Sequence, residues 1–148
     1  MSKIMRAYNT MHKCYKRRIP IIPKLIYYYI RVFYSAEIPP SCTLEKGVDL
    51  VHGGLGVVIH DKAIVGSGTK IYQNVTIAGK TNLENPDARR YPIIGRNVMI
   101  GAGACILGGI TIGNNVQIGA NAVVTHDVPD GAIVVGIPAR PIGSTRKN

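Results

Sequence analysis

The sequence predicts a mainly β fold, a parallel β-helix in which short strands stack in successive coils. Aliphatic residues recur every six positions along most of the chain, a period that fits neither an α-helix nor a plain alternating strand. The 148 residues include 17 Gly but one Phe and no Trp, so we expect a core of Val, Ile and Ala. Both observations are typical of hexapeptide repeats, whose like residues stack in ladders.

The length and composition restrict the class of protein. A chain of 148 residues forms one domain, and its 46% apolar content excludes a disordered chain. No apolar run is long enough to span a bilayer, and the first residues lack the pattern of a signal peptide. Three Cys without C-x-x-C spacing argue against disulfides and zinc. We therefore expect a cytoplasmic protein.

The N-terminal part, residues 1–36, is expected to form a basic, aromatic, helical arm. It holds eight Lys or Arg, no acidic residue, six of the eight Tyr and the single Phe. Pro23 can begin a helix that runs through residues 24–35, and a shorter helix is expected near residues 3–16. Residues 37–148, with a net charge of +2, form the predicted coil domain.

Two interpretations of the arm are favoured over a third. The favoured one is a helical element that packs on a neighbouring subunit while its charges remain in water. The second is peripheral contact of residues 1–35 with an anionic membrane, at its inner face. Nucleic acid is not an expected partner, because the excess positive charge is confined to the arm.

Pro39 and Pro40 mark the entry to the coil, which contains two interruptions. Six-residue units occur in three blocks, which begin at Ile38, Ile59 and Ile94. The first interruption is the segment HGGLG at residues 52–56, and the second is a polar, proline-containing excursion at residues 80–92. Gly and Asn at the corners tolerate a positive φ. Irregular segments in a compact repeat are usually functional.

A combination of motifs carries a family resemblance. The stretches are AEIPPS, LVHGGLGVVIH, IYQNVTIAG, RRYPIIGRNVMIGAGACILGGITIG, IGANAVVTHDVP and VVGIPARPIG. Together they resemble the serine acetyltransferase branch of the hexapeptide-repeat acyltransferases, and most closely its short members associated with surface-polysaccharide synthesis. The resemblance implies a left-handed β-helix, a homotrimer, and acetyl-CoA as co-substrate in a groove between neighbouring coils. It implies no metal.

Three departures from the serine enzymes indicate a different acceptor. Those enzymes have a larger helical domain, an Asp where this chain has Val51, and a His where it has Tyr91. We therefore expect an acetyl-CoA-dependent O-acetyltransferase that acts on a sugar hydroxyl, either small or lipid-linked, in polysaccharide synthesis. Serine O-acetylation in cysteine biosynthesis and a non-catalytic trimeric scaffold are the alternatives.

Two catalytic residues follow from the resemblance. His52 aligns with the family's catalytic His, and its kink is flanked by Gly rather than by core residues. Acetyl transfer to an alcohol needs removal of the hydroxyl proton, which suits a neutral imidazole. Glu37 aligns with a family Asp that hydrogen-bonds this imidazole and would fix its tautomer. A carboxylate at the surface of the coil is the simpler interpretation of Glu37.

The excursion supplies the predicted acceptor residues, Arg90 and Tyr91. By resemblance, they face the acceptor site from the adjacent subunit. An Arg side chain can hold a carboxylate or phosphate, although a solvated loop charge is an equal alternative. Backbone N–H groups near the kink or near residues 77–79 are expected to stabilise the oxyanion.

The donor site is also assigned by alignment. Small residues at Gly79, Ala102 and Ala120 correspond to positions where the family backbone approaches coenzyme A, although hexad corners need small residues in any case. Three further positions lie near the nucleotide end: Thr125, His126 and Arg140. A zinc site like that of β-helix carbonic anhydrases is not expected, because the histidines lack the spacing. His60 is expected to face solvent.

Overall fold

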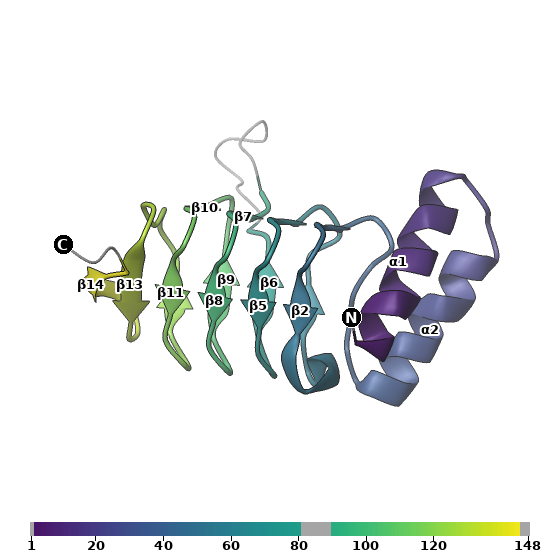
Figure 1. The fold of residues 1–148 in the computed structure, drawn as a ribbon, viewed down its shortest axis with the longest axis horizontal. Helices are drawn as coiled ribbons and strands as arrows, with labels where there is room; N and C mark the ends of the chain where they lie inside the picture. The colour runs from purple at the N-terminus through teal and green to yellow at the C-terminus, as the bar shows by residue number, and fades with distance from the viewer. Residues whose placement is uncertain (1, 81–89, 146–148) are drawn as a thin grey trace.

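A computed structural model describes residues 2–80 and 90–145. Two helices lie at one end of a coil of short strands, and the last strand lies at the other end (Figure 1). The predicted mainly β coil with a helical arm is confirmed. Most of the predicted excursion, residues 81–89, falls outside the described residues. No described helix has the length and apolar character of a bilayer-spanning segment.

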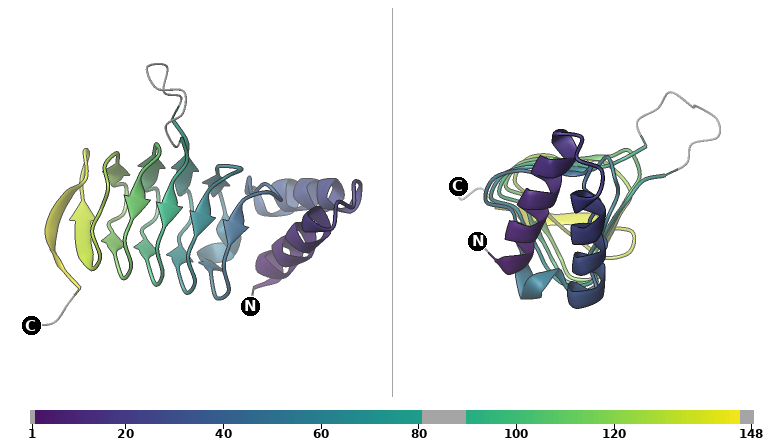
Figure 2. Two further views of the ribbon diagram at one scale, coloured as in Figure 1. Left: turned by 90° about the horizontal axis from the view of Figure 1, so that it is seen from above. Right: turned by 90° about the vertical axis from the view of Figure 1, so that its right-hand side faces the viewer.

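The strands form three sheets, the sides of a three-sided prism (Figure 2). Sheet 1 consists of β1 (Thr43–Leu44), β4 (Ile64–Val65), β7 (Ile93–Ile94) and β10 (Thr111–Ile112). Sheet 2 consists of β2 (Asp49–Leu50), β5 (Lys70–Ile71), β8 (Met99–Ile100), β11 (Gln117–Ile118), β13 (Ala132–Val135) and β14 (Arg140–Ser144). Sheet 3 consists of β3 (Val58–Ile59), β6 (Thr76–Ala78), β9 (Cys105–Leu107) and β12 (Val123–Val124).

Successive coils stack in parallel register. In sheet 2, Ile71 pairs with Ile100, which pairs with Ile118. Only β14 breaks the rule among the described strands, because it pairs antiparallel with β13. The register explains the six-residue period, since each coil places equivalent residues directly over those of the coil before it.

The core consists of the first and fifth residues of each hexad, as the sequence predicts. The first-position aliphatics from Ile94 to Val124 are at most 2% exposed. The fifth positions are also buried, at most 8% exposed, at Val98, Ala104, Ile110, Val116 and Ala122. Corner residues with a positive φ include Asn97 and Asn115, as expected from the tolerance of Asn for this conformation.

Helices α1 (Lys3–Lys16) and α2 (Ile22–Tyr34) lie side by side across the end of the coil (Figure 2). Pro23 lies in the first turn of α2, where its missing N–H has no cost. The buried Tyr8 hydroxyl donates to the Cys42 carbonyl (2.8 Å) and accepts from the Leu44 N–H (3.0 Å). This side chain therefore joins α1 to the first coil.

Candidate functional site

The corners of the prism stack into long edges, and two of them carry the predicted site residues. We call the corners that join sheet 2 to sheet 3 the His52 edge. The corners that join sheet 3 to sheet 1 form the His60 edge. Sheet 3 separates the two edges along the whole coil.

The first interruption is a short 3₁₀ turn, η1 (Val51–Gly54), that projects His52 from the His52 edge. His52 and Gly53 have left-handed backbone conformations, with φ of 56° and 71°. This region is uncommon for a residue with a side chain. Gly54 is also left-handed, and a Cβ at this position would meet the Ile4 side chain of α1 at 3.1 Å. The kink thus combines backbone strain with an exposed imidazole, a pairing found at functional sites.

Tyr72 is the aromatic neighbour of His52, and the sequence analysis missed it. The two ring centroids are 6.2 Å apart in an edge-to-face arrangement. Tyr72 follows Ile71 in the corner one coil after the kink, where the second hexad position is usually Gly. A Tyr at a position that is usually Gly is the signal in the sequence that could have identified Tyr72.

Glu37 lies at the beginning of sheet 3, bridged in parallel to Val58. Its carboxylate Oε2 accepts a hydrogen bond from Arg31 Nη1 at 2.7 Å. Within the described part of the chain, no hydrogen bond joins Glu37 to His52. The carboxylate is thus placed near the helical end and paired with α2, instead of holding the imidazole.

The His60 edge brings Gly79, Arg90 and Tyr91 together. The Tyr91 ring stacks on His60, with centroids 6.2 Å apart and planes 20° apart. The expectation that His60 faces solvent is therefore wrong. Since β7 stacks on β4, the residues just before β7 lie over the corner that follows His60. His60 Nδ1 also accepts from the Lys62 N–H and lies 3.0 Å from the Asp61 carboxylate.

The predicted donor residues divide between the two edges. Ala102 and Ala120 occupy successive corners of the His52 edge and are partly or fully exposed. Arg140 begins β14 beyond the last corner of that edge. Thr125 and His126 lie on the His60 edge and are hydrogen-bonded to each other at 3.0 Å. Each edge of one chain thus carries only part of the predicted site.

Gly79 is required by the packing of the chain itself, apart from any ligand. A Cβ there would lie 2.4 Å from the Arg90 carbonyl oxygen and 2.7 Å from the His60 ring. The chain's own neighbours therefore require Gly at this position. Ala102 is half-buried and Ala120 is exposed, so neither is enclosed by the chain itself.

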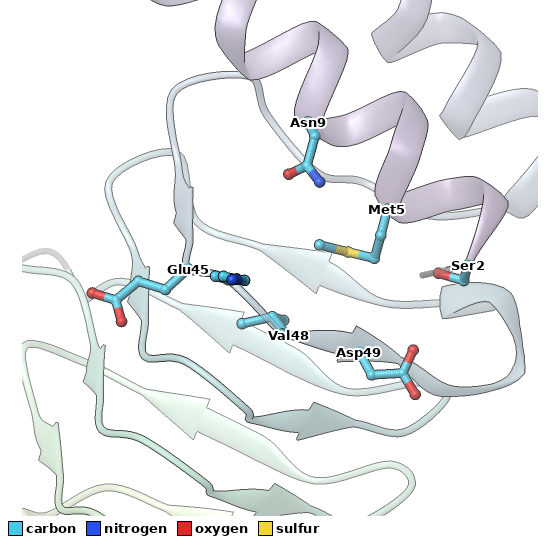
Figure 3. A pocket seen from close by; sticks show the side chains of 8 residues that line it. Ser2, Met5, Asn9, Glu45, Val48 and Asp49 are labelled. Atoms are coloured by element: carbon cyan, nitrogen blue, oxygen red, sulfur yellow. The ribbon is translucent and has the colours of Figure 1, made fainter.

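Other features of the described residues do not add to this site. Residues 2–80 and 90–145 contain no group of three His, Cys, Asp or Glu that could hold a metal ion. A hollow of about 630 Å³ lies between α1 and residues 45–49 (Figure 3). The sequence-predicted site residues are not among those that line it. One of its lining side chains, Glu45, accepts the Ser67 N–H and supports the next coil.

Comparisons with known proteins identify the family. Residues 91–126 match the family "Bacterial transferase hexapeptide (six repeats)". The chain is 44% identical over 136 residues to the serine acetyltransferase of Synechococcus elongatus, covering 92% of this chain and 54% of that protein. It is 37% identical over 140 residues to the serine acetyltransferase of Helicobacter pylori J99, covering 95% of this chain and 80% of that protein. This chain belongs to the serine acetyltransferase family.

Solved structures of the family have the same fold. The serine acetyltransferase of Neisseria gonorrhoeae in complex with serine superposes with a TM-score of 0.84 at 35% identity, covering 93% of this chain and 55% of that one. A serine acetyltransferase in complex with CoA has a TM-score of 0.82 at 29% identity, covering 94% and 55%. The coil is a left-handed parallel β-helix. The chain spans about half the length of the first curated relatives it matches.

These comparisons correct the expected function. A sugar hydroxyl in surface-polysaccharide synthesis was predicted, and this prediction is wrong, because the matched relatives and structures are serine acetyltransferases. The departures at Val51 and Tyr91 are single side chains, whereas the similarity extends over nine-tenths of the chain.

Proposed function

We propose that the protein is an acetyl-CoA-dependent serine O-acetyltransferase in cysteine biosynthesis. The observation that carries the proposal is the identity of 37–46% to serine acetyltransferases over most of the chain, with His52 exposed at the family's kink. The structures in complex with serine and with CoA support the acceptor and the donor. A non-catalytic scaffold would have no reason to hold an exposed imidazole in a strained turn.

In the proposed reaction, acetyl-CoA supplies an activated acetyl thioester. His52 removes the proton from the serine hydroxyl as its oxygen attacks the thioester carbonyl carbon. When the carbon–sulfur bond breaks, the imidazolium returns the proton to the departing thiolate. Backbone N–H groups of the kink are the proposed donors that stabilise the oxyanion. Glu37 is retained as a positioning residue on the resemblance alone.

The proposed active site needs two chains. His52 and Ala102 lie on one edge of the prism, whereas Arg90 and Tyr91 lie on the other edge of sheet 3. In a homotrimer, the His60 edge of one chain can meet the His52 edge of its neighbour. The Arg90 guanidinium would then bind the serine carboxylate as a charge-assisted pair.

The outward faces of the sheets support a trimer. The outward residues of sheet 2 include the charged or polar side chains of Asp49, Lys70 and Gln117, together with the apolar Met99. Those of sheet 3 after Glu37 are uncharged, Val58, Thr76, Cys105 and Val123. Those of sheet 1 are Thr43, Ile64, Ile93 and Thr111. Sheets 1 and 3 are therefore better suited to contact other subunits, because apolar surface gains from burial.

An acceptor panel tests the proposal. The purified protein is mixed with acetyl-CoA and either L-serine or one of several sugars, and free thiol is measured. We expect thiol release and O-acetylserine with L-serine alone. Turnover with none of the acceptors would support the scaffold interpretation and contradict the proposal. His52→Ala serves as the control for non-enzymatic thioester hydrolysis.

A further inference from the structure

Helix α2 presents an apolar face that the described chain leaves exposed. Seven large side chains on this face are 43–73% exposed: Ile21, Ile22, Leu25, Tyr28, Tyr29, Val32 and Phe33. Their spacing of three and four residues places them along one side of the helix. The other side, which includes Pro23 and Ile30, is already buried. A helix that is apolar on both sides is normally covered on both.

A basic hollow adjoins the beginning of this face. It has a volume of about 540 Å³ and is lined by Lys16, Arg18 and Lys24, with Tyr15, Ile19 and three prolines completing its wall. The lining contains three cations and no carboxylate. Residues 1–36 contain no acidic residue at all. The hollow is therefore suited to an anion such as a phosphate monoester or diester.

We propose that this helical end binds the surface of an anionic lipid bilayer. A lipid phosphate would occupy the basic hollow, and the exposed face of α2 would lie among the headgroups and upper acyl chains. An in-plane helix with Lys and Arg beside an apolar face binds membranes in this way. Tyr28 and Tyr29 suit the headgroup region, because their rings are apolar and their hydroxyls polar.

An anionic bilayer accounts for both the exposed apolar face of α2 and the basic hollow. A dimer in which two copies of α2 face each other does not. Two copies meeting through α2 would bring like charges close together around Lys16, Arg18 and Lys24, and such contacts are unfavourable. An anionic surface neutralises these charges. If the trimer of the proposed function forms, its three helical ends point in the same direction. One membrane could then engage all three at once, which multiplies a weak affinity.

Vesicle co-sedimentation of the full chain tests this inference. The probes are phosphatidylcholine vesicles with and without phosphatidylglycerol, each at low and high salt. We expect binding to the anionic vesicles at low salt, at least about tenfold weaker binding to neutral vesicles, and release at high salt. Inorganic phosphate alone, tested by calorimetry, should bind far more weakly than the vesicles, since it lacks the apolar contact.

Two variants separate the contributions. Lys16→Gln/Arg18→Gln/Lys24→Gln removes the charges of the hollow, and its matched control Lys46→Gln/Lys62→Gln/Lys70→Gln removes three exposed lysines of the coil. Leu25→Gln/Val32→Gln/Phe33→Gln removes apolar contacts, and Ile142→Gln, 67% exposed at the other end, is its control. We expect each first variant to lose at least about tenfold in binding, and each control to bind like the wild type.

Several results would overturn the inference. These are equal binding to neutral and anionic vesicles, unchanged binding by both test variants, or preferential binding to nucleic acid. Self-association of the wild type in sedimentation, lost in the Leu25→Gln/Val32→Gln/Phe33→Gln variant, would indicate that a second copy covers α2. This result would also contradict the inference. Circular dichroism of the same samples detects a variant that fails to fold. Their serine acetylation activity tests the proposed function separately from membrane binding.

Discussion

His52 owes its position to an uncommon backbone conformation. Its φ of 56° and ψ of 31° turn the chain out of the coil and expose the imidazole. Val51 and Gly53 flank it in the sequence, and the ring of Tyr72 lies beside it from the next coil. The proposed proton removal at this corner depends on the imidazole of His52.

Replacement of His52 tests its role as general base. His52→Ala and His52→Asn should each lower kcat by about 10²–10⁴-fold, since proton removal typically contributes that much. The oligomeric state and the binding of coenzyme A should remain unchanged, because the His52 imidazole is exposed and is not part of the core of the coil. Steady-state kinetics with saturating acetyl-CoA measure the effect. More than about a tenth of wild-type activity in either variant would contradict the role.

A second residue-scale prediction concerns Tyr8 and Cys42, which are buried between α1 and the coil. Burial raises the pKa of the Cys42 thiol to about 12, and it raises the pKa of the Tyr8 hydroxyl well above its usual range. Both groups hold their protons more tightly when folded than when unfolded. Their stabilising effect is therefore complete below about pH 9 and is lost as the pH rises toward 12.

We expect the free energy of unfolding to fall between about pH 9 and pH 12. Urea denaturation at several pH values measures this change. Tyr8→Phe and Cys42→Ala should each flatten the alkaline part of the curve, and Cys42 should resist thiol reagents at neutral pH. Rapid labelling of Cys42 in the folded protein would show that the thiol is not enclosed.

At the scale of the elements, the stacking distance between coils depends on glycine. A Cβ on Gly95 would lie 2.6 Å from the Gly113 carbonyl oxygen of the next coil, and that backbone cannot move without shifting the ladder. Gly95→Ala should therefore destabilise the protein by about 1–3 kcal/mol. Gly143→Ala is the matched control, because its nearest neighbour would be 3.8 Å away. Equal melting temperatures for the two variants would contradict this explanation.

Most of the fold was predictable from the sequence, because the six-residue period fixes which side chains point inward. Ile94, Ile100 and Ile106 are buried as predicted, and the helices begin near the expected residues. The site was less predictable. The pairing of Glu37 with Arg31 depends on how α2 packs against the coil. The stack of His60 on Tyr91 joins a corner of the coil to the end of the excursion at residues 80–92. The period carries no information about either contact.

At the scale of the whole molecule, the separation of the two edges gives a sharp prediction for the trimer. His52→Ala chains keep Arg90, and Arg90→Ala chains keep His52. If each active site takes one residue from each of two neighbours, unfolding and refolding the two inactive variants together should restore up to about a quarter of wild-type activity. Each variant refolded alone is the control. No recovery in mixed trimers confirmed by mass spectrometry would contradict a shared site.

The antiparallel strand β14 has a consequence for growth of the protein into fibres. A stack of parallel coils could in principle be extended by another molecule, since its last coil offers unpaired backbone groups. Here the terminal strand runs against the direction of the repeat and contains Pro141, which has no N–H to donate. The opposite end is blocked by α1 and α2 (Figure 1). The strand β14 is therefore a poor template for the addition of a further parallel coil.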